Sequence, residues 1–460
     1  MGLLCVLGAC GLLIWSCGTE RKRYQDARFK LVGQLGTDNL LQLLTPPIPA
    51  KDNFFAIPTL NPAQRRREHS TLFWPDHVPK PQLKRHGVGK DEIDFEDWAR
   101  KRGLPSSQAP AALDKLLASE NPLLTELIHA SQRGYSQLIP TYHASLTASS
   151  LDPSVAAAAS TKGFHEGLVN LCLHCRVAAH AGNAAKARQL VPVILRWIQA
   201  ANQGDDLLLG IVATSGNAEV FSTLRDVICT GSLDRSTLTS IQTELSKHDD
   251  IQVFLRGVKV NALALLFAME HQRALETEKL ALRPIKALCM RGYCSLFYDP
   301  NMTFWCESWS SVLAQARFDI DEAAKAFTTV NDTIHNATAL DALNPRVKLA
   351  YMAFPNFSSS IWTQAADNLF SRYCLIFATH VEQFFAENGY YPSSLSQLPQ
   401  FSGLPSEIAT EPIKLNYLNT GHSYVVSTSW RASLQRRLQW ERRITSPLPN
   451  AQQQALIAPP

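Results

Sequence analysis

The fold is decided by a run of amphipathic segments between Phe164 and Glu276. It begins FHEGLVNLCLHCRVAAHAGN (164–183) and continues AAKARQLVPVILRWIQAAN (184–202). In the first segment, apolar residues recur at i, i+3, i+4 and i+7, namely Leu168, Leu171, Cys172 and Cys175. This is the spacing of one face of an α-helix, so the stretch predicts consecutive helices.

Punctuation residues divide this run into predicted helices. Gly182–Asn183 favours a helix stop, and Pro192 predicts a kink or break in the second helix. We expect another break at Gly216–Asn217, with helix caps at Asp205–Asp206 and at 234–236. The longest helix is predicted over 251–273, with Leu266 on its apolar stripe.

The short connections between these helices favour antiparallel neighbours. The expected fold class is mainly α: stacked amphipathic helix pairs in an αα-hairpin array, with an N-terminal membrane-spanning or signal segment and a small C-terminal α+β unit. No 34-residue tetratricopeptide period is present, so the helices are repeat-like in shape and not in sequence.

Composition excludes some classes. The 460 residues are 45% hydrophobic, which allows two or three domains with sizeable cores. A net charge of +4 is too small to indicate nucleic-acid binding. Ten scattered cysteines do not form a disulfide scaffold, and they leave the redox compartment and disulfide state open.

Residues 1–18 form the predicted transmembrane anchor or signal segment. Gly2–Cys17 carries no charge and spans about 24 Å as a helix, against a hydrocarbon core of ~30 Å. A signal peptide is an alternative, and within it Leu7–Cys10 resembles a bacterial lipobox, which implies a lipoprotein modified on Cys10. A buried core helix is the third reading.

The orientation of this segment stays open. Arg21, Lys22 and Arg23 follow the apolar run, and the positive-inside rule then keeps the body in the cytoplasm. If the true start codon lies upstream, a basic region before the apolar run would reverse this orientation. The expected location is a cell membrane, crossed once, with the body in the periplasm.

Residues 19–110 are expected to be a linker helix followed by a proline-rich extended region. PPIPAKDNFFAIPTL (46–60) forbids regular helix, and Phe54 and Phe55 are candidates to dock onto the body. Basic and acidic runs nearly cancel over 61–110, which predicts a solvated surface segment. The helical body is predicted over 111–345 and opens with a helix pair around Pro122.

LTPPIPAKDNFFAIP (44–58), ASENPLLTELIHASQRG (118–134) and the helical block resemble an uncharacterised bacterial family of membrane-anchored helical proteins. The resemblance implies an N-terminal membrane segment, a "PPxPxxxNF" element and a helical body. The matched residues are Pro46, Pro47, Pro49, Asn53 and Phe54. A family stretch of glycine, aromatic residues, Gln and Asn is matched loosely by Gly292–Tyr293 and 298–301. The family has no established activity to carry over.

The last third predicts a smaller unit over 365–430. A long helix is expected over 365–389 with an aromatic stripe at Phe370, Phe377, Phe384 and Phe385. Two strands are expected at 413–417 and 423–427, and helix and hairpin should stabilise each other because isolated hairpins are marginal. Residues 431–460 are expected to be a basic, disordered tail.

This unit resembles the globular part of type II secretion pseudopilins. The matched residues are Asn388, Gly389, Tyr391, Pro392, Leu395, Leu398, Glu411, Pro412, Tyr417 and Tyr424. The segment that binds calcium in some members is replaced by Thr428–Trp430, so no metal is expected. The prepilin cleavage signature is also missing, so the resemblance implies a small domain and not a pilus subunit.

The sequence offers little support for a catalytic site. Cys172-Leu173-His174-Cys175 has CxxC spacing, but both cysteines fall on the apolar face within a helix, which favours buried core residues. Zinc would need two further ligands nearby. The sequence contains no GxSxG, HExxH, Walker or GxGxxG element. We therefore expect no catalytic, cofactor-binding or metal-binding residue and no cofactor.

The expected function is a membrane-anchored cell-envelope scaffold or protein-interaction module, without catalysis. Its predicted partners are the membrane, through residues 1–18, and other proteins, with no nucleic acid. Two alternatives remain: a component associated with a type II-like secretion apparatus, and an enzyme whose site forms only in three dimensions.

Overall fold

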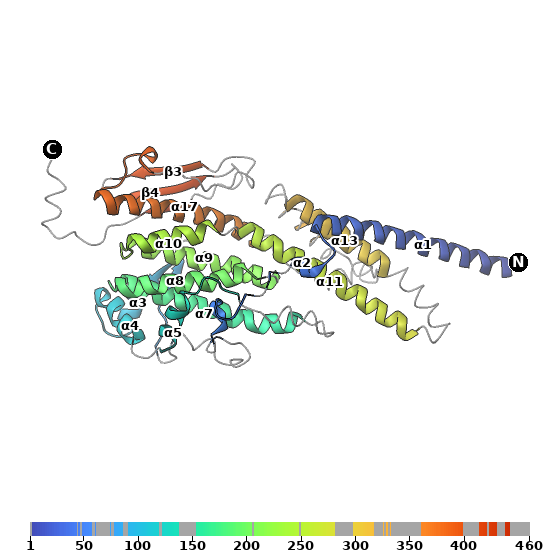
Figure 1. Ribbon diagram of the computed structural model, residues 1–460, viewed down its shortest axis with the longest axis horizontal. Helices are drawn as coiled ribbons and strands as arrows, with labels where there is room; N and C mark the ends of the chain where they lie inside the picture. Colours follow the sequence, from blue (N-terminus) through green and yellow to red (C-terminus); the bar gives the residue numbers. More distant parts are fainter. Residues whose placement is uncertain are drawn as a thin grey trace.

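The computed structural model is mainly helical, with few strands (Figure 1). The structure describes residues 2–43, 45–46, 48–57, 60, 74, 78–85, 91–118, 122–137, 153–204, 207–247, 250–280, 298–316, 325, 328–329, 332, 360–398, 414–420, 423–429 and 438–441. Within some helices and strands, notably over 2–17, 153–163 and 271–280, the backbone is described and the side chains are not.

The central helices end and begin where their residues predict. α7 (Pro153–His180) stops before Gly182, whose φ of 74° suits glycine. Asn183 then caps α8 (Ala184–Asn202), because its side chain accepts a hydrogen bond from Lys186 N at 3.2 Å. α9 (Leu207–Cys229), α10 (Arg235–Ser246) and α11 (Asp250–Leu280) follow.

Asp234 is the N-cap of α10, as expected. Its carboxylate accepts from Thr237 N at 2.9 Å and receives Arg188 Nη1 from α8 at 2.8 Å. These hydrogen bonds, the one to the backbone first, hold the pKa of Asp234 well below its usual range. The predicted cap at Asp205–Asp206 lies outside the described residues.

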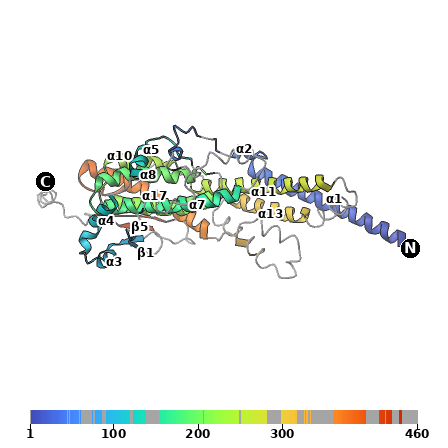
Figure 2. The same ribbon diagram turned by 90° about the horizontal axis from the view of Figure 1, so that it is seen from below.

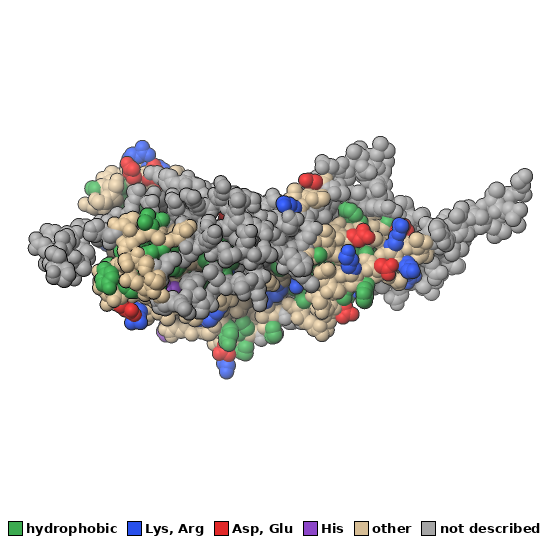
Figure 3. Space-filling model, turned by 90° about the horizontal axis from the view of Figure 1, so that it is seen from above, with side chains coloured by type: hydrophobic (Ala, Val, Ile, Leu, Met, Phe, Trp, Pro, Cys, Tyr) green, Lys and Arg blue, Asp and Glu red, His purple; other side chains and the backbone are tan. Residues whose placement is uncertain are grey.

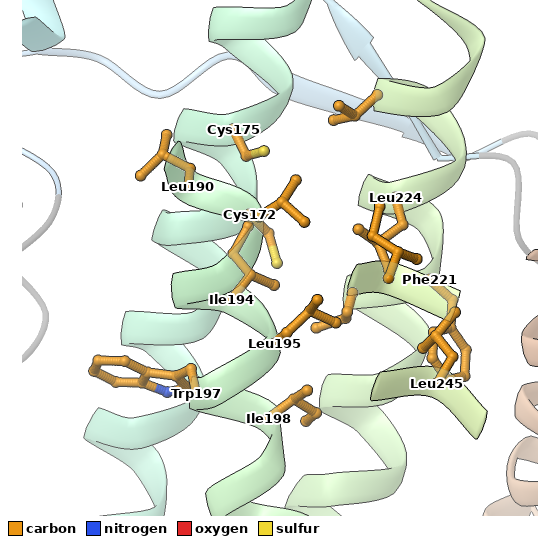
Figure 4. Packing of buried hydrophobic residues seen from close by; sticks show 14 of the residues in the cluster. Cys172, Cys175, Leu190, Ile194, Leu195, Trp197, Ile198, Phe221, Leu224 and Leu245 are labelled. Atoms are coloured by element: carbon orange, nitrogen blue, oxygen red, sulfur yellow. The ribbon is translucent and has the colours of Figure 1, made fainter. Parts of the chain in front are cut away.

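The largest core lies where α7, α8 and α9 pack together, and α10 and the second half of α17 close it (Figure 4). Its centre is made of fully buried aliphatic side chains, including Leu168, Leu190, Ile194, Leu224 and Ile241. Burying each such side chain stabilises the fold by about 1.5–3 kcal/mol.

Of the kink or break predicted at Pro192, the break is wrong, because α8 continues through this residue to Asn202. An internal proline costs a helix roughly 3 kcal/mol. The neighbouring Val191, Val193 and Ile194 are all fully buried, and together their burial is worth more than that cost. Tertiary packing therefore overrides the local helix breaker.

The predicted break at Gly216–Asn217 is also wrong, because both residues lie inside α9. A Cβ on Gly216 would come within 2.8 Å of Ile198 Cδ1, so the glycine allows α9 to approach α8 closely. Asn217 Nδ2 donates to Asn202 Oδ1 at 3.2 Å, and Asn202 Nδ2 donates back at 3.4 Å. This buried amide pair satisfies the polar side chains within continuous helices.

A second core lies at the other end of the molecule. α1 (Gly2–Leu35), α11 and α13 (Asp299–Ala316) lie together there in both ribbon views (Figures 1 and 2). The first half of α17 (Ser360–Asn388) also contributes to it. The buried side chains include Tyr24, Leu31, Leu266, Trp305, Trp309 and Phe370. Because α17 enters both cores, one helix joins the two ends.

A third, smaller core is built by residues 74–117 on the outer face of α7. It combines the short hairpin β1 (Gln82–Arg85) and β2 (Asp91–Asp94) with α3 (Phe95–Arg100) and α4 (Ala109–Ala118), and Trp74, Trp98 and Leu113 are buried in it. α5 (Pro122–Ala130) completes the helix pair predicted around Pro122.

The segment over 19–110, expected to be a linker helix and a proline-rich extended region, supplies buried side chains from its described residues to all three cores. Tyr24 lies in the second core, Phe54 in the largest and Trp74 in the third. Short elements within and beside it are α2 (Leu40–Leu43), η1 (Phe54–Ala56) and η3 (Ser106–Gln108). Burial of its large aromatic side chains stabilises the fold.

α17 packs on a three-stranded antiparallel sheet of order β3 (Lys414–Asn419), β4 (Tyr424–Ser429) and β5 (Leu438–Glu441). The predicted hairpin is therefore confirmed, in the register that pairs Tyr417 with Val426. The expectation of a disordered tail over 431–460 is wrong at β5, because this strand pairs with β4. A single turn, η5 (Leu395–Gln397), lies between helix and sheet in the chain.

Among the residues searched, no helix has both the length and the apolar character needed to cross a bilayer. The predicted anchor lies in the first half of α1, where the backbone is helical but the side chains are outside the described residues. The anchor therefore stays a prediction.

Candidate functional site

The proline-rich element meets the segment after α5 at a buried asparagine. Asn53 is fully buried, and its Oδ1 accepts hydrogen bonds from Phe55 N at 3.1 Å and from Gln137 N at 2.8 Å. Its Nδ2 donates to Gln137 O at 3.0 Å. The amide thus satisfies three backbone groups of two segments 84 positions apart in sequence.

Gln137 returns the interaction. Its Oε1 accepts from Ile48 N at 2.9 Å, and its Nε2 donates to Pro46 O at 3.3 Å. Arg133 adds a hydrogen bond from Nη1 to Asn53 O at 2.8 Å. We call this set, Pro46–Phe55 with Arg133–Gln137, the Asn53 junction.

The two aromatic residues after Asn53 enter the main core, as expected. Phe54 is fully buried, and its ring lies edge-on to Trp197 of α8 at 6.2 Å between centroids. Phe55 approaches Trp197 at 4.9 Å and Phe164 of α7 at 5.7 Å. The junction therefore clamps the proline-rich element onto α7 and α8.

The junction brings together the two segments that carry the bacterial-family resemblance, 46–54 and 118–134. Sequence reasoning missed the contact because the partner amide, Gln137, lies outside both motifs. The side-chain amides of Asn53 and Gln137 are hydrogen-bonded to backbone groups, so the role of the Asn53 junction is structural. The loosely matched stretch of the same resemblance lies at 292–301. Gly292–Tyr293 is outside the described residues, and Asp299 and Asn301 are buried in α13.

Cys172 and Cys175 are fully buried in the main core, which confirms the expectation that they are core residues (Figure 4). Burial raises the pKa of Cys172 well above its ordinary value and that of Cys175 to about 12. A reactive CxxC cysteine requires a lowered pKa. The five cysteines whose side chains the structure describes form no disulfide.

A buried charge beside these cysteines escaped the sequence reasoning. Arg176 of α7 is fully buried, and its Nη2 lies 2.5 Å from Asp226 Oδ2 of α9. Glu219, also on α9, lies 3.9 Å from its Nη1. An unpaired charge on the buried side of a helix is costly, so a sequence alone does not predict one. It becomes predictable only when its partners on another helix are known.

The second core contains a polar clamp between α1 and α11. Glu270 of α11 accepts hydrogen bonds from Tyr24 Oη at 2.5 Å and from Arg28 Nε at 2.7 Å. Burial, and then the carboxylate of Glu270, raise the pKa of Tyr24 far above its ordinary value. The clamp joins the two helices at the point where α1 enters the bundle.

Next to this clamp, a groove of about 570 Å³ lies between α1 and α13. Charges of both signs line it, together with a few apolar side chains: Glu20, Arg23, Asp26, Ala27, Lys30, Pro300, Thr303, Phe304 and Glu307. On the face shown in Figure 3, acidic and basic side chains gather over the end of the molecule nearest the N-terminus. Its volume falls in the range of sites that bind small molecules.

The residues matched to pseudopilins come together around the α17 turn. Gly389 follows α17 with a φ of 75°, and Tyr391 stacks on Phe385 at 4.5 Å between centroids. Tyr417 Oη donates to Pro392 O at 2.8 Å. Glu411–Pro412 lies outside the described residues. No group of three or more metal-ligating side chains occurs in the part of the chain that the structure describes.

Comparison of this chain with family models, with curated proteins and with solved structures finds no match. The two resemblances drawn from the sequence therefore remain predictions.

Proposed function

We propose that this protein is a membrane-anchored helical scaffold. Its α1 inserts the uncharged N-terminal half into a membrane and holds a multi-helix body at the surface, where the body binds other proteins. Stacked helix pairs offer extended surfaces suited to such partners.

The observation that carries the proposal is the continuity of α1. It is one helix from Gly2 to Leu35, and Tyr24, Ala27 and Leu31 in its second half are buried in the bundle. The uncharged part extends through Thr19 without a break, which makes 18 residues, or about 27 Å, against a hydrocarbon core of ~30 Å. A helix fixed in a bundle at one end and apolar at the other is suited to anchor that bundle.

A second candidate, association with a type II-like secretion apparatus, is favoured by one observation. The long helix α17, the Tyr391–Pro392 turn and the hairpin β3–β4 pack as a unit, with Tyr417 bonded to Pro392. This is the arrangement that the pseudopilin resemblance implies. Adducts that contain secretion-machinery proteins in the experiment below would favour this candidate.

In-cell photo-crosslinking tests the scaffold. A photoreactive phenylalanine analogue replaces Phe29, which is 81% exposed on α1, or Tyr390, which is 53% exposed after α17. The matched control places the same analogue at the buried Phe377. A scaffold gives discrete protein adducts at one or both exposed sites and none at the control. Absence of adducts from both exposed sites contradicts the proposal.

A further inference from the structure

The groove between α1 and α13 has an ordered charge pattern. Along α1 its wall alternates in sign, in the order Glu20, Arg23, Asp26 and Lys30. Glu307 faces them from α13. A wall of alternating signs matches a ligand that carries both charges at a fixed separation better than a ligand of one charge.

The position of these residues on α1 is fixed by helix geometry. At ~1.5 Å per residue, Arg23 lies about 6 Å and Asp26 about 10 Å beyond Thr19, the last residue of the uncharged part. A bilayer carries a polar layer of roughly 5–8 Å outside each face of its hydrocarbon core. If α1 is inserted as proposed above, Arg23 lies within the headgroup layer and Asp26 just outside it.

Four charged side chains of the groove are exposed, namely Arg23, Asp26, Lys30 and Glu307. Arg23 pairs with Glu20 at 3.1 Å, but its side chain is 65% exposed, and such surface pairs are weak. Within the described part of the chain, Asp26, Lys30 and Glu307 form no ion pair. Along α1, the Arg23 cation therefore lies one helical turn nearer the membrane than the Asp26 carboxylate, with Glu20 before them and Lys30 after them.

We propose that this groove binds the headgroup of a phospholipid of the phosphatidylethanolamine type; the inference rests on the proposed insertion of α1. The phosphate, which lies nearer the acyl chains, pairs with the Arg23 guanidinium, which suits phosphate oxygens. The terminal ammonium, which lies farther out, donates to the Asp26 and Glu307 carboxylates. The phosphate and ammonium of the lipid are thus complementary to Arg23 and Asp26, in that order along α1.

This chemistry separates related lipids. A primary ammonium has three N–H donors, as in lysine, whereas the quaternary ammonium of phosphatidylcholine has none. Phosphatidylglycerol has no cation, so Asp26 and Glu307 repel it. The groove should prefer phosphatidylethanolamine to both.

The first test needs no membrane. Full-length protein in a maltoside detergent, which has no phosphate, is titrated with glycerophosphoethanolamine, glycerophosphocholine, glycerol phosphate and inorganic phosphate. Glycerophosphoethanolamine should bind most tightly, and Arg23→Gln or Asp26→Asn should weaken it about tenfold, the effect of losing one charge-assisted hydrogen bond. Lys22→Gln and Asp38→Asn make the same charge changes at exposed positions outside the groove and should leave binding unchanged.

Equal affinity for inorganic phosphate would overturn the headgroup assignment and leave a simple anion site. Equal weakening by Lys22→Gln would overturn the groove as the site. In a parallel test, vesicles of each lipid are compared for retention of the native chain after carbonate washing. Loss of the chain from all vesicles would contradict the anchor proposal, and the detergent titration would then decide the headgroup proposal. Equal retention on all vesicles, with no preference among ligands in detergent, would contradict the headgroup proposal alone.

Discussion

Replacement of Asn53 by alanine should destabilise the protein substantially, although no apolar core residue is lost. Asn53→Ala removes the acceptor of the Phe55 and Gln137 N–H groups and the donor to the Gln137 carbonyl. Asn53 is fully buried and Gln137 is 5% exposed, so water does not reach these groups freely. Each buried polar group left without a partner costs about 1–3 kcal/mol.

Three such groups, partly relieved by local rearrangement, give an expected loss of about 3–5 kcal/mol. Domains have ~5–15 kcal/mol of stability in total, so the loss should be plain in a urea titration. Hydrogen exchange localises it: the amides of Phe55 and Gln137 should lose protection. The exposed neighbour Lys51 supplies the matched control, and Lys51→Ala should change the unfolding free energy by less than ~0.5 kcal/mol.

Asn53→Asp separates hydrogen bonding from packing. Aspartate keeps the acceptor but replaces the donor to the Gln137 carbonyl with a second oxygen, so it should also destabilise the protein despite its equal size. The reasoning is refuted if Asn53→Ala unfolds at the same urea concentration as the native protein and both amides stay protected.

Three further outcomes follow from the cores. Leu266→Asp buries an unpaired carboxylate in the second core and should abolish folding by circular dichroism, whereas Leu266→Met should fold. Cys172→Ala with Cys175→Ala should cost stability by loss of packing but leave partner adducts intact; a folded variant that lost them would indicate a chemical role for the thiols. Tyr24 holds its proton in the folded state, so stability should fall as pH rises above ~10, where the unfolded tyrosine ionises. Tyr24→Phe should make that decline smaller; an unchanged profile contradicts the clamp.

The sequence predicted the parts of the fold that depend on local periodicity. The helical class, the long helix that contains Leu266, the docking of Phe54 and Phe55 and the hairpin near Tyr417 are all confirmed. These features are visible because one residue pattern determines each of them.

The errors share one physical cause, which is that tertiary contacts reversed a local signal. Pro192 and Gly216 read as breaks, but burial around Pro192 and close packing at Gly216 keep both helices continuous. The Asn53 junction and the charged groove were missed because each joins segments far apart in the chain. β5 was missed because its short sequence gains a strand conformation only from pairing with β4.

The central claim is that α1 anchors the protein through its uncharged half. The most direct measurement is carbonate extraction of membranes that contain either the full chain or a variant lacking residues 1–18, which leaves the buried part of α1 in place. The account predicts that the full chain stays with the membrane and that the shortened chain is released as a folded, soluble protein. A shortened chain that still resists carbonate, or a full chain that is released, would contradict it.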